Sequence, residues 1–136
     1  MSNIYRVDIL EDRLRDLTGR VPGIQGAVIV SIEGFVVAAY PPVDEENSEY
    51  RMANTPQVAA MAATLVALGE QTLTRLAQGK IERLMIEGED GAMIVYPIDC
   101  NAALAAMIDK KAKIGLALLA ISRAARFFAE ILRGAD

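Results

Sequence analysis

Hydrophobic positions near the start of the chain recur at helical spacing. Apolar residues stand three or four positions apart among charged ones, at Val7, Leu10, Leu14 and Leu17. Such spacing is typical of an amphipathic helix, and Gly19 after it is a helix stop signal. The pattern therefore predicts a first helix with one buried stripe.

Two β-branched runs follow, and they predict a β-hairpin. The runs cover residues 26–32 and 35–40, with the turn pair Glu33-Gly34 between them. Pro41-Pro42 ends the second strand. The acidic stretch 44–49 after it is typical of a solvated connection, with an acidic docking site as the alternative.

A helix predicted after Pro56 is apolar over most of its circumference. Thr55-Pro56 is typical of an N-cap followed by proline at the first helical position, and Gly79 marks the predicted end. One apolar face comprises Val58, Met61, Leu65, Leu68 and Leu76. A second face comprises Ala59, Ala63, Val66, Ala67 and Leu73. A helix of this kind is buried on more than one side, and in a small domain the second side often belongs to a partner.

The rest of the chain predicts a second hairpin and a terminal helix. Strands over 80–88 and 91–98 flank Glu89-Asp90-Gly91, where the Asp-Gly pair supplies the turn. The alanine-rich run 101–108 is ambiguous, because propensity alone favours a helix there. The apolar stripe of residues 114–132 predicts a long last helix.

The length and composition exclude several classes of protein. At 136 residues we expect one domain spanning 1–136. Residues of the set AVILMFWYC make up 53% of it, yet no segment is free enough of charge to span a membrane. A signal peptide is not expected either, because acids and bases occupy the first 15 residues. The apolar surplus therefore indicates a surface buried against another chain.

Charge and residue types also limit the chemistry. There is no His and one Cys, Cys100, so serine-type triads, His/Cys zinc sites and disulfide scaffolds lack their usual parts. The thiol count is typical of the cytoplasm. A net charge of −4 argues against nucleic-acid binding. Cys100 itself is interpreted as a small structural residue.

No group of side chains argues strongly for an enzyme. An acid/base or metal cluster of Glu87, Glu89 and Asp90 is conceivable, but such carboxylates at a hairpin tip are usually a solvated turn. No GxxxxGK[ST] phosphate loop occurs. The lysines at 110, 111 and 113 are interpreted as a solvated turn rather than an anion site. We expect a protein without enzymatic activity, cofactor or metal.

Several segments carry a family resemblance. They are 21–31, the turn Glu33-Gly34 with 35–39, 91–98, and 104–108 with 114–116. In this order they resemble the roadblock/dynein light chain family over about residues 7–132, most closely its stand-alone prokaryotic members. The resemblance implies an α+β fold, a three-layer profilin-like α/β/α sandwich of order α-β-β-α-β-β-β-α. It also implies a five-stranded antiparallel sheet with 102–108 as a central strand, the middle helix on one face and the terminal helices on the other.

The resemblance further implies a homodimer. Copies in this family pair through the middle helix and the edge strand after it, which here would be residues 81–87. The interface residues expected on that basis are Ala59, Ala63, Val66, Leu73, Ile81, Arg83 and Met85.

Family members serve as dimeric platforms for small Ras-like GTPases or larger assemblies. The resemblance therefore implies a scaffold that binds such a GTPase and modulates its nucleotide cycle, with Gln71 and Arg75 as partner contacts. An activator can insert an arginine, but spacing selects none among Arg51, Arg75, Arg83, Arg123 and Arg126. The alternative is a structural adaptor in a signalling or motility assembly, without GTPase contact.

Overall fold

The computed structural model describes the backbone of residues 2–41 and 56–134 and the side chains from residue 7 onward. The predicted acidic loop 44–49, the Thr55 cap and Arg51 lie outside these residues. The elements in chain order are α1 (Ser2–Arg20), β1 (Ile24–Ser31), β2 (Val36–Tyr40), α2 (Pro56–Arg75), β3 (Leu84–Glu87), β4 (Gly91–Asp99), β5 (Ala102–Asp109) and α3 (Ile114–Gly134). This order confirms the predicted succession of helices and strands.

The strands form one antiparallel sheet in the order β2-β1-β5-β4-β3. The ambiguous alanine-rich run is β5, the central strand, with Ala105 paired to Val28 on one side and Val95 on the other. Two neighbouring strands satisfy its backbone groups, and this tertiary pairing overrides the helical preference of alanine. The central strand implied by the resemblance is therefore confirmed.

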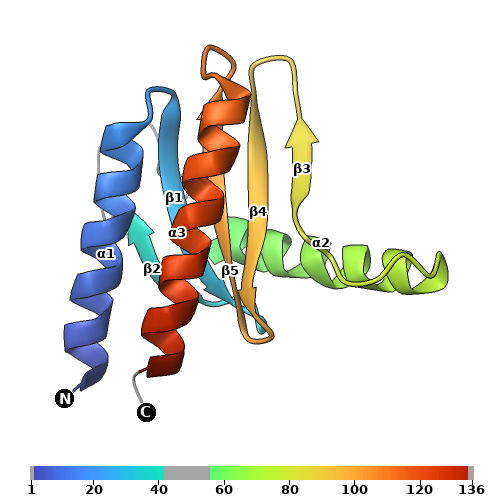
Figure 1. The fold of residues 1–136 in the computed structure, drawn as a ribbon, viewed down its shortest axis with the longest axis horizontal. Coiled ribbons are helices and arrows are strands. Elements are labelled where there is room, and N and C mark those ends of the chain that lie inside the picture. Colours follow the sequence, from blue (N-terminus) through green and yellow to red (C-terminus); the bar gives the residue numbers. More distant parts are fainter. Residues whose placement is uncertain (1, 42–55, 135–136) are drawn as a thin grey trace.

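Helices cover the sheet on both faces, as Figure 1 shows. On one face, Leu10 and Leu14 of α1 and Ile121 and Phe128 of α3 pack into the larger buried cluster. On the other face, α2 contributes to a smaller cluster that includes Val28 and Val95. These three layers confirm the predicted sandwich.

The end of α2 differs from the prediction, because the helix stops at Arg75 rather than near Gly79. The N–H of Gln78 donates to the carbonyl of Leu73 at 2.9 Å, and that of Ala77 donates to Thr74 at 3.1 Å. This pair of bonds is a Schellman motif, whose capping residue adopts the left-handed region. Ala77 does so, with φ of 55°. The helix is therefore capped before Gly79 is reached.

The turn between β3 and β4 also differs from the prediction. The N–H of Gly88 donates to the carbonyl of Gly91 at 2.7 Å, so Glu89 and Asp90 form the tip. Gly91 is not among the residues with positive φ. A Cβ on Gly91 would lie 2.5 Å from the carbonyl oxygen of Ile108 in β5. Glycine is needed here for the close approach of two strands rather than for the turn.

Candidate protein-interaction site

The first half of α2 packs tightly on its own sheet. Ala59 and Ala62 are fully buried there, and Val66 packs at the edge of the same cluster. Gly34, in the turn after β1, faces the helix so closely that a Cβ on it would lie 3.2 Å from the Cα of Ala60. Small side chains on both surfaces therefore bring the helix axis close to the strands.

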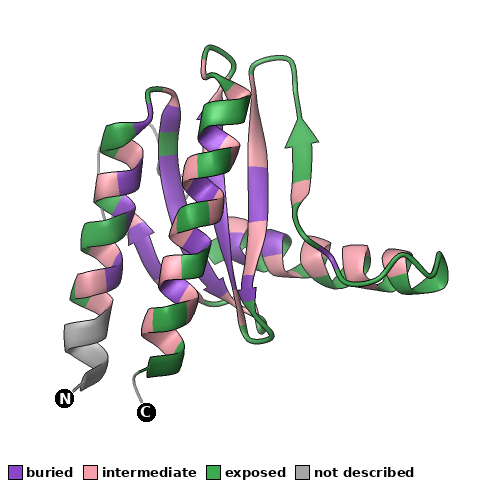
Figure 2. Cartoon of the chain, in the orientation of Figure 1, coloured by how far each residue is buried: buried purple, intermediate pink, exposed green. Residues whose placement is uncertain are grey.

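The second half of α2 extends beyond the sheet. Figure 1 shows the helix crossing behind the strands and continuing past β3, and Figure 2 shows mostly exposed and half-buried residues along that part. The side chains of Leu68 and Leu76 are 57% and 61% exposed. Exposed leucines beyond the edge of a sheet are typical of a surface that meets another protein.

A shallow groove of about 360 Å³ lies between this projecting part and the segment that returns to the sheet. Leu65, Leu73 and Leu84 make its walls largely apolar, and Arg83 adds a charge at the same groove. Gly69 allows the returning chain to pack closely, since a Cβ on it would lie 2.9 Å from Cδ1 of Ile81. The groove is thus a continuous apolar path from α2 to the start of β3.

β3 forms the adjacent edge of the sheet. It pairs with β4 alone, so its outer backbone groups face away from the sheet. Met85 is 40% exposed and Ile86 is 45% exposed, one on each side of the strand. An open edge with apolar side chains is a template for pairing with another strand. We call the projecting half of α2, the groove and β3 together the α2/β3 surface.

The predicted dimer residues are distributed unevenly over this region. Leu73 lines the groove and Met85 lies exposed on β3. Ala63 and Val66 line a second recess, of about 520 Å³, between α2 and the ends of β1, β4 and β5. These four residues stay in the proposed contact.

Of the remaining three predicted dimer residues, Ala59 is corrected, and Ile81 and Arg83 are corrected only in their place relative to the edge strand. Ala59 is fully buried in its own chain and has no surface left for a copy, so it is removed. Ile81 and Arg83 precede β3, which begins only at Leu84, and Ile81 is 8% exposed because it packs under α2. They line the groove rather than the edge strand, and their contact with a second copy stays a prediction.

Sequence reasoning missed the residues that are most exposed on the α2/β3 surface. It identified two apolar faces on α2 but assigned the alanine-containing face to the partner. In the structure Ala59 of that face is buried on the sheet and Ala63, Val66 and Leu73 line recesses beside it, while Met61, Leu68 and Leu76 are more than half exposed. The sequence does contain a signal for this arrangement, because small side chains permit a helix to pack closely on a sheet and large ones do not. The signal can be interpreted only once the structure shows that Gly34 lies against this helix.

The other candidate groups lie apart from one another. Gln71 and Arg75 are exposed on the projecting half of α2. Glu89 and Asp90 are exposed at the hairpin tip, and Cys100 is exposed in the turn after β4, so it has no structural role in the core. Within the described residues, no three acidic, cysteine or histidine side chains are grouped to hold a metal ion. None of the helices described is long and apolar enough to cross a membrane.

Comparison with known proteins identifies relatives over most of the chain. The model of the Roadblock/LC7 domain matches residues 10–108. Two uncharacterised proteins of Methanocaldococcus jannaschii are each 31% identical over 116 residues, covering 84% of this chain and 92% of theirs. A third from the same organism is 30% identical over 121 residues, covering 88% of this chain and 93% of its own.

Solved structures share the fold at lower identity. A structure described as MglB with tetrameric arrangement has a TM-score of 0.82 at 19% identity, covering 96% of this chain and 93% of that one. The gliding protein MglB of Thermus thermophilus has a TM-score of 0.81 at 18% identity, with the same coverage. A Roadblock/LC7 domain of Streptomyces avermitilis has a TM-score of 0.77 at 19% identity, covering 90% and 97%. These likenesses establish the fold.

Proposed function

The chain belongs to the Roadblock/LC7 domain family, and on that premise we propose that it is a homodimeric cytoplasmic scaffold for a small Ras-like GTPase. The observation that carries the proposal is the α2/β3 surface, where exposed leucines adjoin an open strand edge. The family resemblance supplies the class of partner. The scaffold would act without a catalytic group of its own.

A twofold contact through this surface would cover both the open edge of β3 and the exposed leucines of α2. Antiparallel pairing of β3 with a second β3 would join the sheets and satisfy the outer backbone groups of both edges. The projecting half of α2 would then reach over the sheet of the other copy and cover Leu68 and Leu76. A self-complementary patch is what a twofold dimer requires, because each copy presents the same residues.

The dimer would then present the exposed end of α2 to a GTPase. Gln71 and Arg75 are exposed there and are the contacts that we propose. A scaffold changes hydrolysis by favouring one arrangement of the mobile switch loops, because it binds that arrangement more tightly. An inserted arginine is not required for this effect.

The dimer is tested by sedimentation velocity with a matched pair of substitutions. Leu68→Glu places a charge on the α2/β3 surface, and Leu119→Glu makes the same change at a 48% exposed position on α3. We expect Leu68→Glu to yield monomers and Leu119→Glu to leave dimers intact. Dimers of unchanged stability in Leu68→Glu would remove the assignment of the interface.

Binding to a GTPase is tested by calorimetric titration of this chain with the small GTPase encoded nearest to its gene. The GTPase is loaded with GDP or with a non-hydrolysable GTP analogue, and binding is expected to favour one of the two. Arg75→Glu should weaken the complex, and sedimentation velocity of the same variant separates loss of the GTPase contact from loss of the dimer, because Arg75 lies on the same face of α2 as Leu68. Absence of a complex in both nucleotide states would contradict GTPase binding and favour the structural adaptor.

A further inference from the structure

A groove runs between α1 and α3, on the face of the sheet opposite α2. Its volume is about 360 Å³. The floor is apolar and includes Leu17 of α1 together with Ala120 and Phe127 of α3. Such a floor can receive an apolar side chain from a ligand, since that burial removes nonpolar surface from water. We call this recess the arginine groove, after the residues that line its rim.

Three arginines and one aspartate stand at the rim. The guanidinium carbon of Arg13 lies 3.7 Å from the centroid of the Phe127 ring, a cation–π contact that holds the side chain across the groove. The Nε of Arg20 forms an ion pair with the carboxylate of Asp16 at 3.1 Å. Among the described residues, no carboxylate lies within ion-pair distance of Arg13 or Arg123. In this part of the described structure, Arg13 therefore contacts the Phe127 ring and Arg123 stands at the rim, both without a carboxylate partner.

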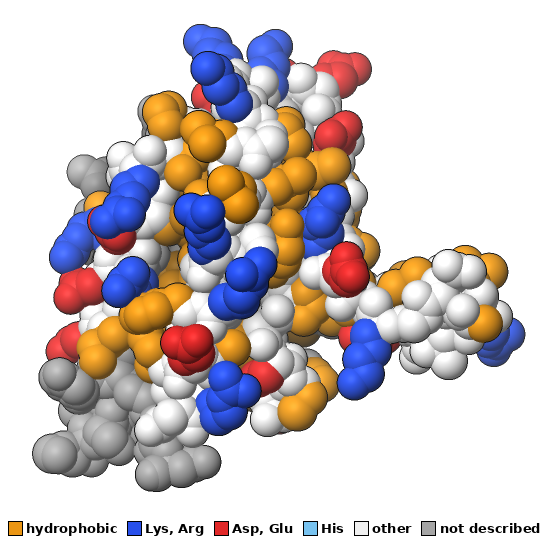
Figure 3. Space-filling view, in the orientation of Figure 1, with side chains coloured by type: hydrophobic (Ala, Val, Ile, Leu, Met, Phe, Trp, Pro, Cys, Tyr) orange, Lys and Arg blue, Asp and Glu red, His pale blue; other side chains and the backbone are white. Residues whose placement is uncertain are grey.

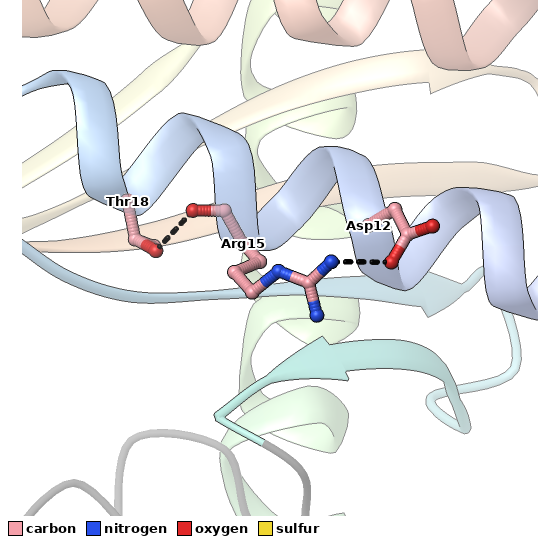
Figure 4. A network of polar contacts seen from close by, with 3 residues as sticks. All are labelled: Asp12, Arg15 and Thr18. Carbon is pink, nitrogen blue, oxygen red and sulfur yellow. Dashed lines mark hydrogen bonds and ion pairs between the residues drawn. The ribbon is translucent and has the colours of Figure 1, made fainter.

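A second ion pair of α1 lies away from the groove. Figure 4 shows that Arg15 reaches back along the helix to Asp12, with an N–O distance of 2.7 Å, and that the Thr18 hydroxyl donates to the Arg15 carbonyl. Both side chains of this ion pair are more than half exposed, so it lies on the solvent side of α1. Both ion pairs found among the described residues lie on α1, so Arg123 at the rim is one of several basic side chains of the described structure without a carboxylate partner.

The charge around the groove opposes that of the whole chain. Residues 109–134 carry six basic and two acidic side chains, a net charge of +4, in a chain whose net charge is −4. Figure 3 shows Lys and Arg side chains spread over this face, with apolar patches between them. Charge complementarity of this kind steers an acidic partner toward the face and fixes its orientation.

Two exposed leucines extend the apolar floor. Leu116 and Leu119 are 51% and 48% exposed and lie one helical turn before Ala120 and Arg123. Positions four apart share one face of a helix, so the leucines continue the stripe that lines the groove. The groove side of α3 thus carries the apolar positions Leu116, Leu119, Ala120 and Phe127 with one arginine, Arg123, among them.

We propose that the arginine groove and these leucines dock an acidic segment of another protein, one with apolar residues between its carboxylates. From Leu116 to Phe127, α3 rises about 17 Å, which about five residues of extended chain would cover. A concave recess suits a narrow peptide better than the flat surface of an anionic membrane. This site is on the opposite face from the α2/β3 surface and does not depend on GTPase binding.

The first test selects peptides from a random library displayed on phage, using the full chain as bait. Enriched sequences should combine Asp or Glu with Leu, Ile or Phe, and a synthetic peptide of that sequence should bind with affinity that falls as salt is raised. A selection without acidic enrichment would overturn the proposal.

The second test locates the binding with charge reversals on the same helix. Arg123→Glu alters the groove, whereas Arg133→Glu makes the same change at an exposed position outside it. Arg123→Glu should weaken the selected peptide about tenfold or more, and Arg133→Glu less than about twofold. Equal losses in the two variants would show attraction to net charge alone and would overturn the site. Circular dichroism checks that both variants are folded.

A third arm separates the peptide from a membrane. Vesicles of phosphatidylserine and phosphatidylcholine are sedimented with the unmodified chain, with and without the selected peptide. The proposal expects no co-sedimentation beyond that with pure phosphatidylcholine. Binding to the anionic vesicles that the peptide displaces would assign the groove to a lipid surface and overturn the choice of a peptide.

Discussion

Gly23 lies directly against Ala112, so that the turn after α1 touches the turn before α3. A Cβ on Gly23 would clash with the Cβ and Cα of Ala112, and the φ of Gly23 is 99°. The carbonyl of Gly23 also accepts a hydrogen bond from the N–H of Asp109 at 2.7 Å. This contact fixes the relative position of the two helices that form the arginine groove.

Replacing Gly23 should therefore destabilise the fold. Gly23→Ala forces a residue with a side chain into a left-handed backbone conformation, and its Cβ clashes with Ala112. We expect the free energy of unfolding, measured in urea, to fall by about 2 to 4 kcal/mol. Gly19→Ala is the control, because a Cβ there meets nothing within 4 Å. It should leave stability unchanged or raise it by up to about 1 kcal/mol. Equal changes in the free energy of unfolding for Gly23→Ala and Gly19→Ala would contradict the close contact between Gly23 and Ala112.

The end of α2 predicts a stabilising substitution. Ala77 caps the helix with φ of 55°, a region that glycine occupies without steric cost. Ala77→Gly should raise the free energy of unfolding by about 0.5 to 1 kcal/mol, despite the added backbone entropy. Ala67→Gly, within the exposed helix interior, should lower it by about 1 kcal/mol. Both are measured by urea denaturation at one protein concentration, and a destabilised Ala77→Gly would contradict the Schellman cap.

Two phenylalanines should differ sharply in their contribution to stability. Phe128 is fully buried, and its ring meets that of Phe127 edge-on at 6.0 Å. Phe128→Ala should cost about 3 to 5 kcal/mol in thermal or urea unfolding, because it leaves a cavity in the larger cluster. Phe35 is 69% exposed, and Phe35→Ala should change stability by less than about 0.5 kcal/mol. A loss of stability below this range in Phe128→Ala would contradict the prediction and show that the helices and sheet move together to fill the cavity.

Disulfide formation can map the proposed pairing of β3. Single cysteines are placed at each position of 84–87 in a Cys100→Ser background, which removes the one native thiol. An antiparallel self-pair brings some positions within disulfide distance and keeps others apart, so cross-linking should be strong at one or two of the four. Leu119→Cys is the control and should not cross-link. Uniform or absent cross-linking within a proven dimer would contradict the pairing of this edge.

The order and type of the elements could be predicted because they depend on local patterns and on the resemblance. The exception among the patterns was β5, whose alanines favour a helix until two neighbouring strands are in place. The start of β3 was placed too early. Ile81 looks like a strand residue, but the chain returning from the cap at Ala77 must first pass beneath Gly69.

The candidate sites were harder to predict because they join distant segments. Both apolar faces of α2 were visible, yet which face meets the sheet depends on the fit of Ala59 and Ala62 to the strands. The arginine groove gave no local signal at all. Arg13 and Phe127 come from opposite ends of the chain and meet only when α1 and α3 lie side by side.

The shortness of β3 bears on how long a pair of copies would stay together. Four residues in each strand allow only about four shared backbone hydrogen bonds in an antiparallel pair. The rate of dissociation would then be governed by the leucines of α2, whose contact is not directional and is little affected by salt. Subunits held in this way can exchange between dimers. In a cell with a second chain of this fold, mixed pairs would form wherever the leucine surfaces match.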